Sequence, residues 1–378
     1  MKILLAFDSF KGSASSEQLS DAAEAAIRRE IPDCEIVKFP IADGGEGTTA
    51  AICSALDTKA VRCTVHDPLM HPIDVEYRVT GDTAIMEMAA ASGLPLIEPA
   101  ERNPELTTTF GTGEMILDAI EKGCKTIILG IGGSATNDAA IGMLTALGVK
   151  FTDTAGKPTM RLTEVVAVDD SRIDARLSKT RFIVACDVNN PLYGENGAAC
   201  VFAPQKGADP EQVERLDAAL RRFADLIKET KDIDLQSIAG AGAAGGMGGG
   251  MVAFLNAQLK SGIDTILEIT GFDNALAGTD LVLTGEGCID NQSGMGKAIG
   301  GIIAHASKAH VPVVAIGGGV APDVDVNAMG LLAAFSIQQR PTTLEEAMKT
   351  ENTIANVQRT VTQIIRLITC ASSFHSQD

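Results

Sequence analysis

Residues 125–138 read KTIILGIGGSATND, and this stretch combines a strand signal with residues that can carry chemistry. Its apolar run, residues 127–129, predicts a strand that leads into glycines, small hydroxyl residues and a carboxylate. Glycines let a backbone approach an anion closely, hydroxyls and amides donate hydrogen bonds, and an acid holds a metal ion or accepts a proton. A tight strand-to-helix turn capped by Ser134 or Thr136 explains the same residues, so this loop alone leaves both interpretations open.

The length and charge of the chain restrict its organisation and its partners. Its 378 residues exceed the roughly 250–300 residues at which single cores stop growing, which predicts two domains. The net charge of −18, without a compensating basic run, disfavours nucleic acid and anionic membranes as partners. An anionic substrate would need local lysines or backbone N–H groups to overcome this charge.

The cysteines and histidines form no familiar metal or disulfide pattern. The eight cysteines include no CxxC pair, which favours a reduced, cytoplasmic protein, and the histidines form no HxxxH or HExxH motif of a zinc site. The apolar run at the amino terminus has five residues, too few for a signal peptide. No stretch predicts a transmembrane span.

Strands and helices alternate at both ends of the sequence. Residues 3–7 and 35–41 predict strands around a helix at 15–29, opened by the capping-box sequence SSEQ. From residue 280 the alternation returns, with predicted strands at 281–284, 313–316 and 331–335 and helices at 297–309, 344–349 and 353–368. This order favours a parallel sheet with helices on its faces.

The middle of the chain has a different pattern. Closely spaced strand candidates at 59–65, 74–80 and 83–88 suit an antiparallel or mixed sheet, followed by a strand at 182–186 and helices at 113–122, 139–147, 210–229 and 251–259. We therefore predict an α/β protein in which residues 1–70 and 275–378 form a discontinuous, doubly wound parallel-sheet domain of Rossmann or flavodoxin type. A second α/β domain, residues 71–274, is inserted into it, and the active site is expected in the cleft between the two.

Six predicted strands end in polar or glycine-rich loops, at residues 8–13, 43–48, 130–138, 187–190, 285–290 and 317–319. All of these loops except the last carry a carboxylate. Ligands of open parallel sheets bind beyond the carboxyl ends of the strands, so these loops predict an active site. Carboxylates, glycine loops and sparse lysines favour magnesium-dependent phosphoryl transfer, with metal-free acid–base chemistry as the competing use. The sequence has no Walker A motif and no protein-kinase signature.

A nicotinamide oxidoreductase is the alternative that the glycine patterns leave open. Residues 240–245 match GxGxxG but follow a helical stretch, and residues 130–135 follow a strand but have no acid about 20 residues further on.

Lys11 stands at a helix start, where the dipole disfavours cations, so phosphate contact is favoured over a solvated lysine. Asp187 suits either a functional role or an Asx turn before Pro191, whereas Met247 and Met251 are expected to pack.

Eight motifs in order carry a resemblance to a known family: DSFKGS, ADGGEGT, TTFGTGEM, GIGGSATND, ACDVNNPL, PQKGAD, GAGAAGGMGG and TGEGCIDNQSGMGK. Together they resemble the bacterial two-domain glycerate kinases over nearly the whole chain. The resemblance implies a discontinuous α/β domain with an inserted domain, and transfer of the γ-phosphoryl group of ATP, with Mg²⁺, to the 2-hydroxyl of D-glycerate. The partners expected are these small molecules, and the protein is expected to be a monomer or homodimer.

The residues at the motif positions receive expected roles from their chemistry. Asp187 is expected to be the base for the substrate hydroxyl and Lys11 a second catalytic residue, and Glu286 and Asp290 are expected to hold Mg²⁺. The expected substrate and phosphate ligands are Ser9, Ser13, Asp43, Ser134, Thr136, Asn137, Asp138, Asn189 and Lys297. The glycines expected to bind the nucleotide are Gly132, Gly133, Gly245 and Gly246.

Three positions depart from the pattern common among these kinases. Cys288 and Phe110 stand where many relatives have Arg, and Met295 stands where they have His. Each departure removes a possible cation from a site for a carboxylate and a triphosphate. A catalytically weakened nucleotide-binding paralogue is therefore a further alternative.

Overall fold

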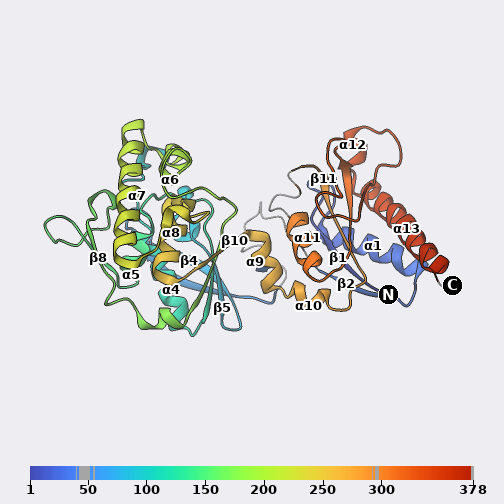
Figure 1. The fold of residues 1–378 in the computed structure, drawn as a ribbon, viewed down its shortest axis with the longest axis horizontal. Coiled ribbons are helices and arrows are strands. Elements are labelled where there is room, and N and C mark those ends of the chain that lie inside the picture. The colour runs from blue at the N-terminus through green and yellow to red at the C-terminus, as the bar shows by residue number, and fades with distance from the viewer. Residues whose placement is uncertain (40, 42–51, 54–55, 292, 294–297, 376–378) are drawn as a thin grey trace. The chain divides into compact units, whose positions relative to one another are not determined.

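The computed structural model describes residues 1–39, 41, 52–53, 56–291, 293 and 298–375, and they form two compact units. Residues 1–56 and 263–378 make up the first unit, which is therefore built from both ends of the chain, and residues 57–262 make up the second. In Figure 1 the first unit takes the blue and the orange to red segments. The predicted fold class, a discontinuous doubly wound domain with an inserted α/β domain, is confirmed.

The boundaries between the units differ from the predicted ones, because strand pairing decides the first boundary and core packing decides the second. Residues 57–70 belong to the second unit, because β3 (Lys59–His66) pairs along its whole length with β4 (Pro72–Thr80). Residues 263–274 belong to the first unit, because Ile263, Leu267 and Phe272 pack in one of its cores.

The first unit contains a five-stranded, fully parallel sheet in the order β13-β12-β11-β1-β2. Its strands span β1 (Lys2–Phe7), β2 (Glu35–Lys38), β11 (Leu281–Ile289), β12 (Val313–Val320) and β13 (Ala333–Ser336). The chain runs outward from β1 to β2 on one side and from β11 to β13 on the other. The strand order therefore reverses between β1 and β11, where the loops of doubly wound sheets diverge and ligands bind.

Helices cover both faces of this sheet, because successive residues of each strand point to opposite sides. Ile3, Leu5 and Phe7 pack with α1 (Ser16–Glu30) and α13 (Thr350–His375), whereas Leu4 and Ala6 pack with α9 (Gly262–Ile269), α10 (Phe272–Leu276) and α11 (Ala298–Lys308). The predicted capping box at α1 is present, with Ser15 accepting from the Gln18 N–H. The short helix α12 (Leu344–Ala347) precedes α13.

The second unit contains a six-stranded mixed sheet in the order β10-β9-β6-β5-β4-β3. Its strands are β3, β4, β5 (Thr83–Glu87), β6 (Thr126–Gly130), β9 (Arg181–Ala185) and β10 (Gln258–Lys260), and β7 (Lys150–Thr152) pairs with β8 (Ala167–Asp169) in a separate ribbon. The pairs β3–β4 and β4–β5 are antiparallel, and the pairs β5–β6, β6–β9 and β9–β10 are parallel. The antiparallel strands come first in the chain, which explains the change of pattern along the sequence.

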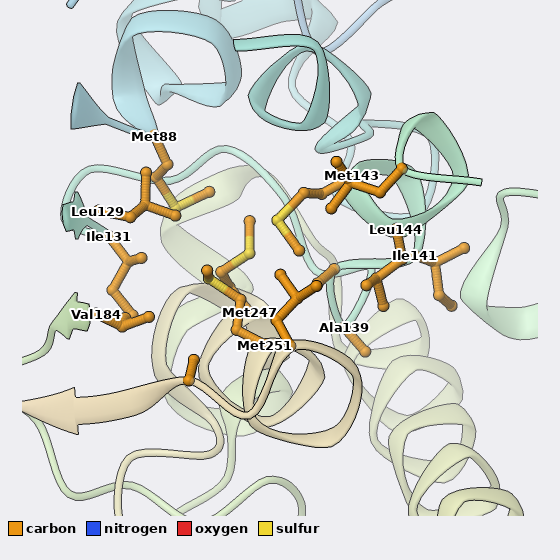
Figure 2. Packing of buried hydrophobic residues seen from close by; sticks show 14 of the residues in the cluster. Met88, Leu129, Ile131, Ala139, Ile141, Met143, Leu144, Val184, Met247 and Met251 are labelled. Atoms are coloured by element: carbon orange, nitrogen blue, oxygen red, sulfur yellow. The ribbon is translucent and has the colours of Figure 1, made fainter. Parts of the chain in front are cut away.

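The helices of the second unit pack on this sheet around an extensive apolar core. They are α3 (Ala89–Ser92), α4 (Phe110–Glu121), α5 (Ile141–Ala146), α6 (Ala198–Phe202), α7 (Pro210–Lys231) and α8 (Ala243–Leu255), with short 3₁₀ helices at Leu94–Leu96, Pro99–Glu101, Leu162–Glu164, Ala175–Lys179, Pro204–Lys206 and Leu235–Ser237. Figure 2 shows Met247 and Met251 of α8 among Leu129, Ile131 and Met143, and both are fully buried. The prediction that these two methionines pack is confirmed.

Several predicted element ends were wrong, and two of the errors concern the expected loops. Residues 285–289 and 317–319 lie inside β11 and β12, because the two strands stay paired in register as far as Ile289 and Val320. The helix expected at 251–259 ends at Leu255, since Asn256 takes a left-handed conformation, and β10 follows. The helix expected from residue 139 starts at Ile141, because Ala139 and Ala140 have positive φ.

Two further observations concern the whole chain. The eight cysteines carry free thiols. Among the helices that the structure describes, none is both long and apolar enough to cross a membrane.

Candidate functional site

Three parallel strands bring the candidate loops of the second unit to one edge of its sheet. Gly130 at the end of β6 is in register with Ala185 at the end of β9 and with Glu87 at the end of β5. The loops that follow β6 and β9 therefore leave neighbouring strands in the same direction. These loops carry the predicted residues Ser134 to Asp138 and Asp187 to Asn189.

The loop after β6 is polar in sequence and yet largely buried. Gly132 and Gly133 are exposed, whereas Ser134 is 8% exposed and Thr136, Asn137 and Asp138 are between 0% and 3% exposed. Buried polar groups of this kind are normally hydrogen-bonded, because an unpaired group costs the loss of its hydration. The partners of each side chain therefore show what the loop is built to do.

Asp138 is held by donors of the protein itself. One of its oxygens accepts hydrogen bonds from the Thr109 N–H (2.9 Å), the Thr109 hydroxyl (2.8 Å) and the Gly142 N–H (3.1 Å), and the other accepts from the Ala140 N–H (3.2 Å). Burial raises the pKa of Asp138, and these donors oppose the rise because they favour the carboxylate. Asp138 thus fastens the loop to the starts of α4 and α5, and its predicted contact with substrate stays a prediction.

Lys206 completes this buried cluster from a distant part of the sequence. It is 2% exposed, and its ammonium donates hydrogen bonds to Ser134 Oγ (2.8 Å) and to the Thr136 carbonyl oxygen (2.7 Å). Burial lowers the pKa of Lys206 to about 7, and the negative charge of Asp138 opposes this shift. Lys206 lies in the motif PQKGAD, but no role was predicted for it from the sequence. A lysine directly before a glycine in such a loop could have indicated an anion-binding residue.

Thr136 and Asn137 contain buried polar atoms without partners. In the described part of the chain, no hydrogen bond reaches Thr136 Oγ1 or either polar atom of the Asn137 side chain. Both residues are completely buried. Groups of this kind in a folded protein point to a ligand or an ordered water that satisfies them.

The glycine-rich start of α8 lies against the same loop. Gly245 has φ +71°, and a Cβ built on it would lie 2.2 Å from the Thr136 carbonyl oxygen and 2.6 Å from Asn137 Cα. The Gly245 carbonyl also accepts the Ala139 N–H at 2.9 Å. The close approach that requires glycine at this position is thus to the chain's own backbone, and nucleotide contact by Gly245 and Gly246 stays a prediction.

Asp187 and Asn189 are both exposed in the loop after β9. Asp187 Oδ1 accepts a hydrogen bond from the N–H of Gly262, the last residue of the second unit, at 2.7 Å. This contact fixes one oxygen of the carboxylate and orients the group. An oriented, exposed carboxylate at the end of a parallel strand fits the predicted base.

In the first unit, the predicted loop residues follow β1 at the point where the strand order reverses. Phe7 is in register with Gly285 of β11, so residues 8–13 begin beside the second half of β11. Ser9 is partly buried and Lys11 is exposed. Ser13 is tied to α13, since its hydroxyl lies 2.5 Å from Thr353 Oγ1 and its carbonyl accepts from the Thr350 hydroxyl at 2.6 Å.

The two predicted metal ligands lie on one strand and just past its end. Glu286 is within β11 and partly buried, and Asp290 follows β11, with its N–H donating to Ser293 Oγ at 2.9 Å. A strand rises about 3.3 Å per residue, so four residues separate the two α-carbons by about 13 Å. Carboxylate oxygens suit Mg²⁺, but its ligands must lie at about 2.1 Å, so this spacing favours one of the two carboxylates as a direct ligand. Within the described ranges, no group of three or more acidic, His or Cys side chains is placed to hold a metal.

The remaining predicted residues lie on a strand or helix, or outside the residues that the structure describes. Cys288 is an exposed residue of β11, and Phe110 starts α4 with its ring edge-on to His66, with centroids 5.9 Å apart. Asp43, Met295 and Lys297 lie outside the residues that the structure describes.

Comparisons with known proteins agree over nearly the full length of the chain. The model of the glycerate kinase family matches residues 3–369. A Bacillus cereus protein named glycerate kinase is 43% identical over 99% of this chain and 100% of its own, and an Escherichia coli K12 protein named glycerate 2-kinase is 43% identical over 92% and 93%. A crystal structure of a candidate glycerate kinase 2 from Salmonella typhimurium LT2 superposes with a TM-score of 0.79 at 42% identity, covering 99% of both chains. The chain therefore belongs to the glycerate kinase family and is a phosphotransferase enzyme of that family.

Proposed function

We propose that this enzyme transfers the γ-phosphoryl group of ATP to the 2-hydroxyl of D-glycerate and so forms 2-phosphoglycerate. The observation that carries the proposal is the buried loop of residues 134–138 with Lys206, which gathers a cation and unsatisfied hydrogen-bonding groups in an otherwise acidic protein. Such a loop suits an anionic, hydroxyl-bearing substrate. The Escherichia coli relative named glycerate 2-kinase supports position 2 as the acceptor.

In this proposal the second unit orients the acceptor. Ser134 and Asn137 donate hydrogen bonds to the substrate, and Asn189 contributes an amide from the neighbouring loop. Asp187 accepts the proton of the attacking hydroxyl, because its carboxylate is exposed and held in one orientation by the Gly262 N–H. A loose phosphoryl-transfer transition state requires the acceptor to be well placed more than it requires a strong base.

The first unit handles the phosphates. Ser9 and Lys11 follow β1 at the reversal of strand order, where doubly wound sheets bind their ligands. Lys11 is exposed and supplies a positive charge to the phosphate oxygens. Asp43 and Lys297 are assigned to phosphate binding as well, because of their positions in the family motifs.

Magnesium enters the proposal as the partner of the nucleotide. A bound Mg²⁺ would supply positive charge that neutralises the charge developing during phosphoryl transfer. Glu286 or Asp290 would hold it through one carboxylate.

The proposal is tested by following ADP release with purified protein. ADP should form with D-glycerate, ATP and Mg²⁺ together and should not form when any one of the three is omitted. Phosphorus NMR of the product should show a phosphate ester on oxygen 2. ADP release that ignores D-glycerate, an ester on oxygen 3, or reduction of NAD⁺ by D-glycerate would each contradict the proposal.

Cys288 allows a prediction about substrate affinity. The variant Cys288→Arg places a cation on β11, two residues from Glu286, and we expect the KM for D-glycerate to fall about two- to fivefold, the effect of an exposed charge contact. Steady-state kinetics at saturating ATP measures the change. The matched control is Cys370→Arg, which adds the same charge at an exposed position of α13 and should leave the KM unchanged. Equal effects of the two variants would show that only net charge matters.

A further inference from the structure

Lys206 belongs to the buried cluster on which the proposed function rests, but the roles above give it no contact with a ligand. Its ammonium makes two hydrogen bonds, to Ser134 Oγ and to the Thr136 carbonyl, and within the described ranges no ion pair joins it to a carboxylate. An ammonium has three N–H donors. One donor of Lys206 is therefore available to a further acceptor, in a position that is otherwise shielded from water.

Ser134 connects this cation to an open side of the loop. Because Lys206 donates to Ser134 Oγ, the hydroxyl hydrogen of Ser134 is directed elsewhere. Ser134 follows the exposed Gly132 and Gly133, and a Cβ built on Gly132 would have no atom within 4 Å. The Ser134 hydroxyl, held by Lys206, thus stands next to exposed backbone with open space around it, where a ligand can approach.

Additional unpartnered groups lie around the same turn. The side-chain polar atoms of Thr136 and Asn137 lack hydrogen-bond partners in the described part of the chain, and so does the buried Nε of Arg102. The Arg102 backbone lies against Gly207, the residue after Lys206, since a Cβ on Gly207 would lie 2.4 Å from the Arg102 carbonyl oxygen. An oxyanion matches the donors of this set, which are the Lys206 ammonium, the Thr136 hydroxyl and Asn137 Nδ2, because it supplies acceptors and a negative charge. The unpartnered Asn137 Oδ1 needs a donor, such as a hydroxyl of the substrate or a water molecule.

We propose that Lys206 and Ser134, with Asn137, form an oxyanion site, and that Lys206 takes up a proton when the anion binds. The inference rests on the proposed function, which offers two sources of one chemistry: the carboxylate of D-glycerate and the phosphoryl group of ATP. Lys206 acts there as a binding residue and as a positioning residue for Ser134.

The direction of the proton transfer follows from the charges near Lys206. The charge that acts on Lys206 is that of Asp138, on the loop that Lys206 contacts. Burial lowers the pKa of Lys206 to about 7, and an anion beside the ammonium raises this pKa because it favours the charged form. Above pH 7 the complex therefore holds a proton that the free protein lacks, and affinity falls as the pH rises further.

Calorimetry measures this proton directly. Titrations of the full-length enzyme with D-glycerate, without nucleotide, in two buffers of different ionisation enthalpy give the number of protons taken up. We expect about 0.9 proton per bound anion at pH 8 and about 0.1 at pH 6, since a group with a pKa near 7 is mostly neutral at the first pH and mostly charged at the second. Parallel titrations with sulfate, a tetrahedral oxyanion that does not titrate in this range, represent the phosphoryl group.

Three variants assign the proton to Lys206. Lys206→Met should abolish the uptake and weaken anion binding at pH 6 at least tenfold, because it removes a hydrogen bond from a charged donor. Lys206→Arg keeps a permanent charge and should bind without uptake at either pH. Lys157→Met removes an exposed lysine of the same unit and should behave as the original protein.

The outcomes separate this inference from the proposed function. Uptake at pH 8 with D-glycerate identifies the carboxylate as the ligand, and uptake with sulfate alone identifies the phosphoryl group. Binding of both anions without uptake, or uptake that persists in Lys206→Met, overturns the inference and leaves the kinase proposal standing. If the Lys206 variants fail to fold, the uptake of the original protein at the two pH values still decides. An enzyme that neither binds nor phosphorylates D-glycerate disproves the proposed function, and the sulfate titration then tests the site by itself.

Discussion

Replacing Asp187 by Asn is expected to lower kcat for glycerate phosphorylation by about 10²- to 10⁴-fold and to leave the KM for D-glycerate within about threefold. The range is the usual contribution of a positioned general base. Asn has nearly the same shape as Asp, and its side-chain carbonyl can still accept the Gly262 N–H, so the loop after β9 should keep its conformation. What Asn cannot do is accept the proton of the substrate hydroxyl.

The control for this variant is Asp153→Asn, which makes the same change of charge in a turn elsewhere in the second unit. There the Asp153 carboxylate accepts backbone hydrogen bonds from Ala155 and Lys157, both at 2.9 Å. Its kcat should match that of the original enzyme. Near-normal turnover of Asp187→Asn, with its circular dichroism spectrum unchanged, would show that Asp187 serves only to hold the Gly262 N–H.

Replacing Gly245 by Ala should produce the largest loss of stability among the substitutions discussed for this chain. The new Cβ would lie 2.2 Å from the Thr136 carbonyl oxygen and 2.6 Å from Asn137 Cα, distances at which backbone must move. The residue also has φ +71°, where alanine is strained by roughly 1–2 kcal/mol. Strain and overpacking together should reduce the free energy of unfolding by about 3–5 kcal/mol. Urea unfolding followed by circular dichroism measures the loss.

A second glycine separates the two contributions. Gly156 has φ +73°, and a Cβ built on it would have no atom within 4 Å. Gly156→Ala should therefore cost only the backbone strain, about 1–2 kcal/mol, and retain D-glycerate binding. Gly245→Ala should lose binding as well, because the displaced backbone carries Thr136 and Asn137. Equal losses of stability in the two variants would mean that the contact with residues 136–137 is unimportant.

The sequence predicted the regular parts of the fold because their signals are local. The apolar run at residues 3–7 gave β1, the sequence SSEQ gave the start of α1, and the closely spaced runs from residue 59 gave the antiparallel strands. The predicted ends of β11 and β12 were wrong for a nonlocal reason. Glycines usually mark a loop, but here the two strands pair in register on both sides of Gly287 and Gly318 and so include these glycines.

In the candidate site, too, local features were predicted from the sequence, whereas contacts between distant segments were not. The glycines and small polar residues at 130–138 indicated a ligand loop, and the family resemblance was confirmed across residues 3–369. No pattern in the sequence indicated that Asp138 would be enclosed by Thr109 and the start of α5, or that Gly245 would lie against Thr136. Those contacts join segments that are far apart in the chain.

The stretch KTIILGIGGSATND by itself determined a strand, a turn and a set of possible donors, because propensity and hydrogen-bonding capacity are properties of the residues themselves. Only the tertiary structure decided the electrostatics of that loop. It brings Lys206, 72 residues away from Ser134, into a buried position against the Ser134 hydroxyl. The cost of desolvating a charge depends on everything packed around it, so the pKa of Lys206 near 7 is a property of the folded second unit and not of the sequence PQKGAD.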